Sequence, residues 1–241
     1  MNSDHRRPRL ALFALDHTLL PIDSDYEWGA FTIRMGWNDP VEFARRNDAF
    51  YAHYQAGTLD VHDYVRFATE AVRLRGPEAA TAAHAQFMRE VINPAIQPQA
   101  LALVRAHQAA GDEVLIVTAT NEFVTRPIAQ ALGVGDAGLM AVQLARDAQG
   151  WYTGEIDGIP TMREGKVLRM EQWLAARQWG WSDVESTFYS DSMNDVPLLE
   201  KVDHPVATNP DPRLRVLAQE RGWRILDLFA ADAQTPAPPA A

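Results

Sequence analysis

The chain has 241 residues, of which 47% are hydrophobic and 22% charged, and its formal net charge is -10. This length fits one domain or one domain with an insertion, and the acidic balance argues against nucleic acid or an anionic membrane as the main partner. The absence of cysteine excludes disulfides, thiolate metal sites and a cysteine nucleophile. No apolar run approaches the roughly 20 residues of a membrane span, and residues 1–8 lack a signal-peptide core, so we expect a cytoplasmic protein.

The first part of the chain changes from a strand pattern to a helical pattern. Residues 9–15 are almost all apolar, which predicts a buried strand. From about residue 24 to residue 91, apolar residues recur at helical spacing, as at Trp28, Phe31 and Met35, and glycines interrupt the run. The pattern predicts about four helices inserted after the first strand.

Strand and helix patterns alternate in the rest of the chain. Helices are predicted at 101–110, 127–132, 167–179 and 211–221. Strands are predicted at 113–117, 139–144, 186–189, 205–207 and 224–228, with a hairpin arm at 151–154. This alternation favours an α/β fold with a parallel sheet, in which ligands bind at the carboxyl ends of the strands.

Small polar clusters stand at the ends of three predicted strands and at the start of one helix. Residues 16–18 follow the first strand, Thr118 ends the second, residues 191–195 follow a later strand, and Lys166 opens a helix. Because the carboxyl ends of parallel strands meet at one edge of the sheet, we expect an active site there.

These four clusters resemble the four motifs of the haloacid dehalogenase superfamily of phosphotransferases, near its phosphoserine phosphatase-like branch. The resemblance spans nearly all of residues 9–228. It implies a Rossmann-like parallel sheet core with an all-helical cap inserted after the first strand. The predicted boundaries are 9–22 and 96–230 for the core, 23–95 for the cap, and 1–8 and 231–241 for disordered tails.

The first motif of that superfamily is Asp-x-Asp-x-Thr, and its first Asp is the nucleophile that forms an aspartyl-phosphate. In this chain that position is Ala14. The second acid is present as Asp16, which by resemblance protonates the leaving group and then activates water. A spacing of two places both residues on one face of an extended strand. The alternative is that Asp16 and its neighbours only cap a turn.

Asp191 and Asp195 are the predicted Mg²⁺ site, because Mg²⁺ prefers oxygen ligands and usually takes one or two carboxylates. The resemblance implies three ligands: a carboxylate at position 14, the backbone carbonyl of Asp16, and Asp191, with Asp195 in support. Ala14 removes one of them, so weaker metal affinity is expected. The alternative is a helix N-cap, with Asp191 or Ser192 as the cap and Asp195 interacting favourably with the helix dipole.

Phosphate binding is predicted at Thr118, through its hydroxyl and the backbone N–H groups of Ala119 and Thr120. It is also predicted at Lys166, because a cation in a first helical turn opposes the helix dipole and invites a functional reason. The alternatives are an ordinary turn threonine and a solvated surface lysine. Arg163 is a possible substitute for Lys166.

Two further residues are candidates for contact with the substrate. Asn121 lies on the same predicted loop as Thr118. By resemblance, an acid shortly after the first motif contacts a substrate amine, and Asp23 is the nearest one, with helix N-capping as its alternative. Together with Asp25 and Glu27 it indicates an amine-bearing substrate, such as phosphoserine or histidinol phosphate. The candidates for binding a carboxylate instead are Arg45, Arg46, Arg66 and Arg73.

The sequence as a whole predicts a Mg²⁺-dependent phosphomonoesterase for a small phosphate ester, active as a monomer or homodimer. The chain itself is expected to be inactive, because its nucleophile is missing. A deliberate substitution that traps substrate is favoured as the origin of Ala14. The alternatives are a natural phospho-ligand binder without catalysis and a phosphotransferase whose acceptor is not water.

Overall fold

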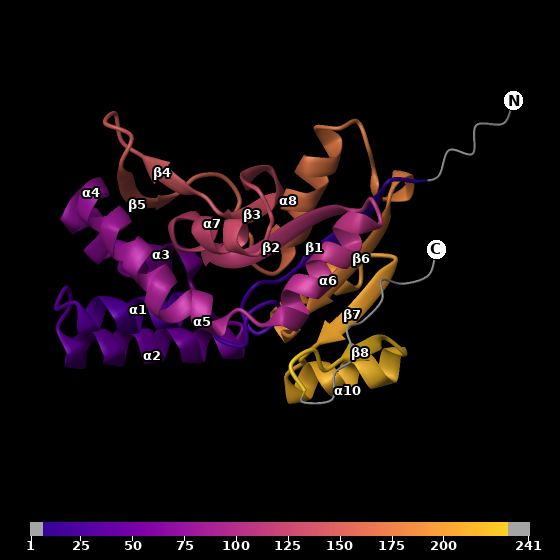
Figure 1. Cartoon of the computed structure of the whole chain (residues 1–241), viewed down its shortest axis with the longest axis horizontal. Coiled ribbons are helices and arrows are strands. Elements are labelled where there is room, and N and C mark those ends of the chain that lie inside the picture. The colour runs from indigo at the N-terminus through magenta and orange to yellow at the C-terminus, as the bar shows by residue number, and fades with distance from the viewer. Residues whose placement is uncertain (1–6, 231–241) are drawn as a thin grey trace, which may run out of the picture.

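A parallel sheet of six strands is the centre of the computed structural model, which describes residues 7–230 (Figure 1). The order across the sheet is β3-β2-β1-β6-β7-β8. The strands are β1 (Arg9–Phe13), β2 (Glu113–Asn121), β3 (Leu139–Val142), β6 (Glu185–Ser190), β7 (His204–Thr208) and β8 (Arg224–Leu226). The chain leaves β1 towards β2 and β3 on one side and later fills the other side from β6. A reversal of this kind leaves a crevice at the carboxyl end of the central strands.

Helices cover both faces of the sheet, as expected for strands that are apolar at nearly every position. Neighbouring residues of β1 point to opposite faces, so Leu12 belongs to one apolar cluster and Phe13 to the other. The Leu12 face is covered by α8 (Glu164–Ala175), α9 (Val196–Leu199) and α10 (Pro212–Arg221). The Phe13 face is covered by α6 (Pro98–Ala109) and α7 (Glu122–Ala131). The predicted α/β class with a parallel sheet is confirmed.

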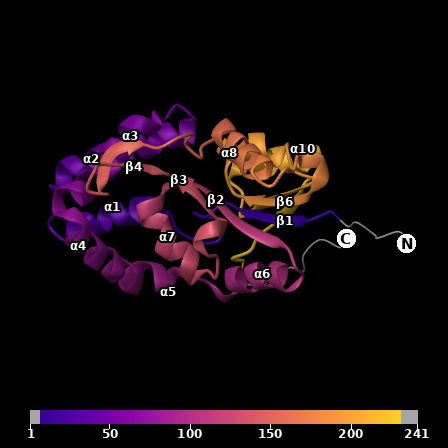
Figure 2. The same cartoon turned by 90° about the horizontal axis from the view of Figure 1, so that it is seen from above.

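The segment between β1 and α6 is helical and forms a layer at one end of the molecule (Figures 1 and 2). Its elements are α1 (Ser24–Arg34), α2 (Pro40–Ala56), α3 (Val61–Ala68), α4 (Glu70–Phe87), the π-helix Met88–Ile92 and α5 (Asn93–Ala95). The first three helices begin at aspartates, Asp23, Asp39 and Asp60, each of which accepts two backbone N–H bonds. These helices form the predicted cap.

A two-stranded hairpin from the second half of the chain packs against the cap. Its antiparallel strands are β4 (Leu144–Arg146) and β5 (Tyr152–Ile156). The Trp151 indole N–H donates to the carbonyl of Arg73 on α4 at 3.3 Å. Arg66 on α3 forms an ion pair with Glu155 at 3.2 Å. The insertion is therefore helical as predicted, but the layer it builds also includes this hairpin.

Three element boundaries near the site differ from the prediction, and one of them is the start of α8, which lies at Glu164 rather than at Val167. β2 continues to Asn121, four residues beyond the predicted end, and α7 begins at Glu122 rather than at Pro127. The short 3-10 segments Asp136–Gly138, Trp181–Asp183 and Met193–Asp195 were not predicted.

The ends of the described chain can be placed only in part. Residues 1–6 and 231–241, most of the predicted tails, lie outside the described residues. Pro8 accepts the N–H of Glu185 at 2.9 Å, so the chain runs beside β6 before β1 begins. None of the helices within residues 7–230 combines the length and apolarity needed to cross a membrane.

Candidate active site

A cavity of about 740 Å³ lies between the carboxyl ends of the central strands and the cap. Eight of the nine site residues predicted from the sequence line it: Ala14, Asp16, Asp23, Thr118, Ala119, Lys166, Asp191 and Asp195. The ninth, Asn121, does not. The sheet therefore brings together residues that lie up to 181 positions apart, since Ala14 and Asp195 share one cavity.

Ala14 lies one residue beyond β1, and its N–H still donates to the Tyr189 carbonyl at 2.9 Å. It is 5% exposed, and its methyl group stands where the resemblance implies a nucleophilic carboxylate. Asp16 is fixed from two sides, because its oxygens accept the Ser24 N–H at 2.7 Å and the Thr120 hydroxyl at 3.0 Å. Asp16 thus faces the cavity in a defined orientation.

Lys166 is buried and ion-paired with Asp195, with Nζ 2.7 and 2.8 Å from the two carboxylate oxygens. The Ser190 hydroxyl also donates to Asp195, at 2.7 Å. The alternative of a solvated surface lysine is therefore wrong, because α8 packs onto the sheet and carries this residue inward. Arg163 does not substitute for Lys166, since its guanidinium donates to the carbonyl of Gly57 in the cap.

Asp191 accepts the Thr18 hydroxyl at 2.9 Å. Burial, and next the charge of Asp195, raise the pKa of Asp191 to about 7. Neither carboxylate caps a helix: the Ser192 side chain caps the 3-10 turn Met193–Asp195, and Asp195 makes no cap bond to α9. The N-cap alternative is therefore confirmed for Ser192 and wrong for Asp191.

Thr118 lies inside the long β2, where the pairing with β3 shifts register after Val117. Its hydroxyl accepts the N–H of Thr120 at 3.1 Å, and its carbonyl accepts the Thr161 hydroxyl at 2.6 Å. The local backbone is thereby held so that residues 118–120 face the cavity. The alternative of an ordinary turn threonine does not describe this strand residue.

Asn121 is turned away from the cavity because it starts a helix. Its side-chain oxygen accepts the N–H groups of Phe123 and Val124 at 3.1 and 3.3 Å, which makes it the N-cap of α7. The structure does not bring Asn121 to the substrate space, and its contribution there is indirect, through the position of α7.

The donor atoms at the base of the cavity are oxygens, the type that Mg²⁺ prefers. Six aspartates line the cavity against the two cations Lys166 and Arg213: Asp16, Asp23, Asp25, Asp191, Asp195 and Asp211. Within residues 7–230, no three His, Cys, Asp or Glu side chains converge well enough to hold a metal ion. The donor set fits Mg²⁺ in kind, and a methyl group at Ala14 takes the place of one implied ligand.

On the cap side, Asp23 and Asp25 reach the cavity from the start of α1. Asp23 is the N-cap of this helix, as its alternative interpretation predicts, and it lines the cavity as well. Burial, together with the charge of Asp16, holds the pKa of Asp23 well above its usual range. Asp25 accepts the Tyr64 hydroxyl at 2.5 Å, and burial raises the pKa of Asp25 to about 6.

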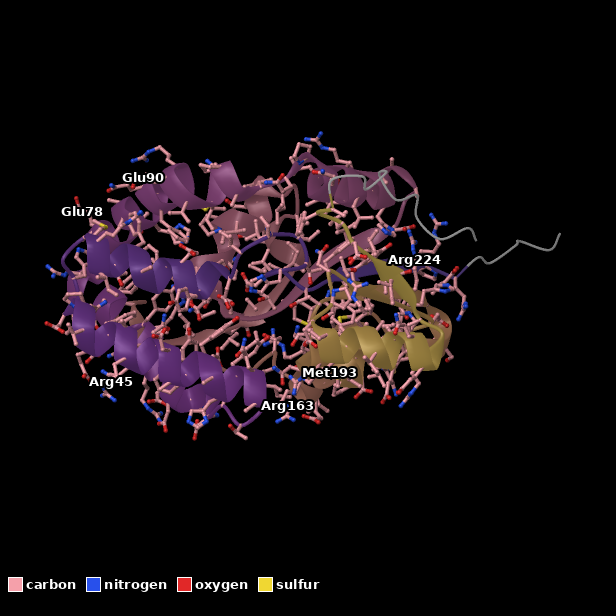
Figure 3. The ribbon with its side chains drawn as sticks, turned by 90° about the horizontal axis from the view of Figure 1, so that it is seen from below. Arg45, Glu78, Glu90, Arg163, Met193 and Arg224 are labelled. Atoms are coloured by element: carbon pink, nitrogen blue, oxygen red, sulfur yellow. The ribbon has the colours of Figure 1, made fainter. Side chains whose placement is uncertain are left out.

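The four cap arginines proposed as carboxylate ligands do not line the cavity. Arg45 pairs with Glu42, Arg46 with Glu70, and Arg66 with Asp63 and Glu155; Arg73 donates to the Arg66 carbonyl. Figure 3 shows Arg45 out along the cap, away from Arg163 and Met193 at its junction with the core. Their interpretation as substrate ligands is wrong, because helical periodicity turns them outward.

Core side chains also hold the carboxyl end of α2 from three different segments. The Asn194 amide donates to the Tyr54 carbonyl at 2.9 Å, and Arg213 donates to the Gln55 carbonyl at 3.0 Å. Arg163 donates to Gly57, as described above. The last carbonyls of a helix lack the regular partner four residues on, and the Tyr54 carbonyl accepts only the C-cap N–H of Gly57 locally, so the core donors add bonds here that join the cap to the core.

Sequence reasoning missed several residues that shape the site. The hydroxyls of Thr18, Thr120 and Ser190 each bind one of the active-site carboxylates. The sequence did indicate Thr18, because it is the threonine of the Asp-x-Asp-x-Thr pattern. Ser190 and Tyr64 had no such signal, because each meets its aspartate only through the tertiary fold.

The site is an acidic, oxygen-rich crevice that contains one buried lysine. It lies at the carboxyl end of a parallel sheet whose two faces are both covered by helices, which defines the class of protein as an α/β protein with a polar site at the sheet edge. The family model of haloacid dehalogenase-like hydrolases matches residues 11–200. The chain therefore belongs to this family.

Relatives and solved structures agree with that assignment. The chain is 41% identical over 219 residues to a histidinol-phosphatase of Neisseria meningitidis serogroup C (strain 8013), which covers 90% of this chain and 98% of the relative. A crystal structure of a protein of unknown function from Bordetella pertussis Tohama I matches with a TM-score of 0.86 and 50% identity, covering 93% and 100% of the two chains. A substrate-bound phosphoserine phosphatase shares the fold, with a TM-score of 0.62, 17% identity, and 92% and 94% coverage. The predicted superfamily, its phosphoserine phosphatase-like branch and an enzyme of the phosphatase class are confirmed.

Proposed function

We propose that this fold serves the Mg²⁺-dependent hydrolysis of a small, amine-bearing phosphomonoester, and that the chain as it stands is inactive because residue 14 is alanine. One observation carries the proposal. Asp16, Thr118, Lys166 and the Asp191–Asp195 pair are assembled around one cavity, and the methyl group of Ala14 lies among them.

Each residue has a role that its contacts support. With an aspartate at position 14, its carboxylate attacks phosphorus, and Asp16 protonates the leaving oxygen and then accepts a proton from water. The Ser24 N–H and the Thr120 hydroxyl hold Asp16 in orientation for both steps. Lys166, the Thr118 hydroxyl and the Ala119 N–H group bind phosphoryl oxygens, whereas the Thr120 N–H and hydroxyl are engaged by Thr118 and Asp16.

Mg²⁺ is proposed because the cavity has more negative than positive side chains. A phosphate dianion placed among these aspartates needs additional positive charge. Asp191 and the backbone carbonyl of Asp16 would hold the ion, with Asp195 fixed behind them by Lys166. When bound, Mg²⁺ neutralises phosphoryl charge and orients the ester.

The cap supports the amine-bearing class of substrate. Asp23 and Asp25 face the cavity, whereas the cap arginines pair with acids elsewhere. The similarity to a histidinol-phosphatase over 98% of that relative points the same way. A phosphomonoester as ligand, the cytoplasm as compartment, a monomer or homodimer as assembly and the domain boundaries given above remain predictions.

The test is the Ala14→Asp protein in a screen of phosphomonoesters with Mg²⁺. Turnover is expected to rise by at least about 10³-fold over the parent chain, because a covalent nucleophile is restored. Ala14→Asn is the matched control, since it adds a side chain of the same size without a nucleophile, and it should stay inactive. Turnover by the parent within about tenfold of the Ala14→Asp protein would contradict the role of residue 14.

Two alternatives give different results in the same screen. A natural phospho-ligand binder stays inert across the panel even with Asp at position 14. A phosphotransferase forms a new ester when alcohol acceptors are added. Ala14 motivates the first alternative, since loss of a nucleophile leaves the phosphate-binding groups in place.

A further inference from the structure

We infer that the carboxylate of Asp25, positioned by Tyr64, selects the leaving group, and that this group carries a cationic N–H donor and no carboxylate. This inference rests on the proposed function, because it concerns the leaving-group end of the same cavity. It narrows the amine-bearing class to substrates without an amino-acid carboxylate, so a phosphoserine-like ester is disfavoured.

One carboxylate oxygen of Asp25 has no hydrogen-bond donor among residues 7–230. The residue is 8% exposed and lines the cavity. One carboxylate oxygen accepts the Tyr64 hydroxyl at 2.5 Å. The other is buried and has no hydrogen-bond partner among residues 7–230. A buried carboxylate oxygen left unsatisfied is unfavourable, and an N–H group of a ligand in the cavity supplies the missing donor.

The neighbouring acids are not equivalent to Asp25. Asp23 is only partly buried, and one of its oxygens accepts the N–H groups of Asp25 and Tyr26 at 3.0 and 2.9 Å at the start of α1. Glu27 lies in the same helical turn but does not line the cavity. Of the three acids in this segment, Asp25 is therefore the one that is buried, lines the cavity and keeps a buried oxygen without a partner among residues 7–230.

The rest of the cap surface also suits a cation. Aromatic rings line the same side of the cavity: Tyr26, Phe50, Tyr51, Tyr54 and Tyr64. The faces of such rings attract cations, and their flat sides accommodate a planar cationic group. Among the described cap residues that line the cavity, none is lysine or arginine, and the guanidinium of Arg213 on the core side donates to the Gln55 carbonyl, so the cap itself offers no cation to pair with a carboxylate of the ligand.

Tyr64 acts on the substrate through Asp25. It comes from α3, whereas Asp25 belongs to α1, so their contact fixes the carboxylate between two cap helices. The same hydrogen bond lowers the pKa of Asp25 against the effect of burial, which keeps the carboxylate charged. Tyr64 is therefore a positioning residue.

Calorimetry on the parent chain with Mg²⁺ tests the inference, using four probes: histidinol phosphate, phosphoserine, phenyl phosphate and inorganic phosphate. The parent should bind histidinol phosphate at least about tenfold more tightly than phosphoserine. Asp25→Asn should lose about tenfold or more in affinity for histidinol phosphate and change less than about twofold for phenyl phosphate and inorganic phosphate. Glu27→Gln, the matched control, removes the same charge from the same turn and should leave all four affinities unchanged.

Tyr64→Phe gives a second variant that keeps the carboxylate. It should reduce the ratio of histidinol phosphate affinity to phenyl phosphate affinity about threefold, an effect that a general loss of structure does not produce. If Asp25→Asn does not fold, this ratio decides the matter, and an unchanged ratio overturns the inference. The inference is also overturned if the parent binds phosphoserine and histidinol phosphate with equal affinity. It is overturned as well if Asp25→Asn loses equal affinity for histidinol phosphate and for phenyl phosphate.

The result separates from the test of the proposed function. If the Ala14→Asp protein is inert on all esters while the parent still loses histidinol phosphate binding on Asp25→Asn, hydrolysis is refuted and the role of Asp25 is upheld. The opposite result is that the Ala14→Asp protein hydrolyses esters equally well whether or not the leaving group is cationic, and that Asp25→Asn does not change these relative rates. In that case the function holds and the role of Asp25 is refuted.

Discussion

At the scale of single residues, Asp25 shows how a binding group opposes folding. Burial raises the pKa of Asp25 from 3.8 to about 6. An acid with a raised pKa in the folded state binds its proton more tightly when folded. Its contribution to stability is therefore full below about pH 4 and is lost as the pH rises through 6. The buried, charged carboxylate of this residue thus costs stability at neutral pH.

This gives a prediction for Asp25→Asn. Relative to the parent, the variant should gain on the order of 2 kcal/mol in free energy of unfolding between pH 4 and pH 8, because asparagine does not titrate. Urea unfolding of both proteins at several pH values measures the difference. A stability difference that stays constant with pH would mean that Asp25 titrates normally in the folded chain.

Lys166 provides a second residue-scale prediction. Its ammonium neutralises Asp195, and both side chains are 4% exposed. Lys166→Met leaves a buried carboxylate with only the Ser190 hydroxyl, so it should destabilise the protein by about 3 kcal/mol or more. Lys201 makes a half-exposed ion pair with Glu171 at 3.8 Å, and Lys201→Met should cost less than about 1 kcal/mol. Similar costs for the two variants in denaturant unfolding would contradict the structural importance assigned to the buried pair.

At the scale of elements, α2 connects the cap to the active site. The carboxyl end of this helix receives three core donors, and two of them, Asn194 and Arg163, lie next to the motifs that carry Asp195 and Lys166. The position of the cap over the cavity is therefore coupled to the segments that carry Lys166 and Asp195.

Removal of one of these donors should loosen the end of α2. Asn194→Ala deletes the hydrogen bond to the Tyr54 carbonyl, worth about 1 kcal/mol, so amide hydrogen exchange in residues 51–58 should accelerate about fivefold. Arg45→Ala is the control, because Arg45 on the same helix bonds only its neighbour Glu42 among the described residues. Equal exchange in both variants would show that the Asn194 bond does not restrain the cap.

At the scale of the whole molecule, the proposed binding of Mg²⁺ would be linked to folding. An ion that binds the folded chain stabilises it in proportion to its affinity. The Ala14→Asp protein regains one implied ligand beside Asp191. In 10 mM Mg²⁺ its melting temperature should rise by about 3 °C or more, and that of the parent by less than half as much. Ala14→Asn serves as the steric control, and chelator should reverse the shift. Equal shifts in all three proteins would exclude residue 14 from the metal site.

Local patterns in the sequence were enough for the main elements and for most of the site. An apolar run such as residues 9–15 can only be a buried segment, and polar residues at the end of such a run must lie at an edge of the sheet. For this reason Asp16, Thr118 and Asp191 were placed correctly at one cavity. The start of α1 at Asp23 was also readable, because an N-cap is a contact within three residues.

The tertiary structure decided everything that depends on contacts between distant segments. Lys166 is buried because α8 packs onto the sheet near Asp195, and the helical pattern of its own segment does not contain that partner. Asn121 turned out to be the cap of α7, since β2 runs four residues further than its apolar run. The cap arginines point outward, and Tyr64 meets Asp25 across 39 residues. By itself, the sequence determined the family and the sheet and predicted that the nucleophile is missing, because these follow from residue types and their local spacing. Only the fold determined which charges face the substrate, because burial and pairing are properties of side chains that meet through the packing of distant elements.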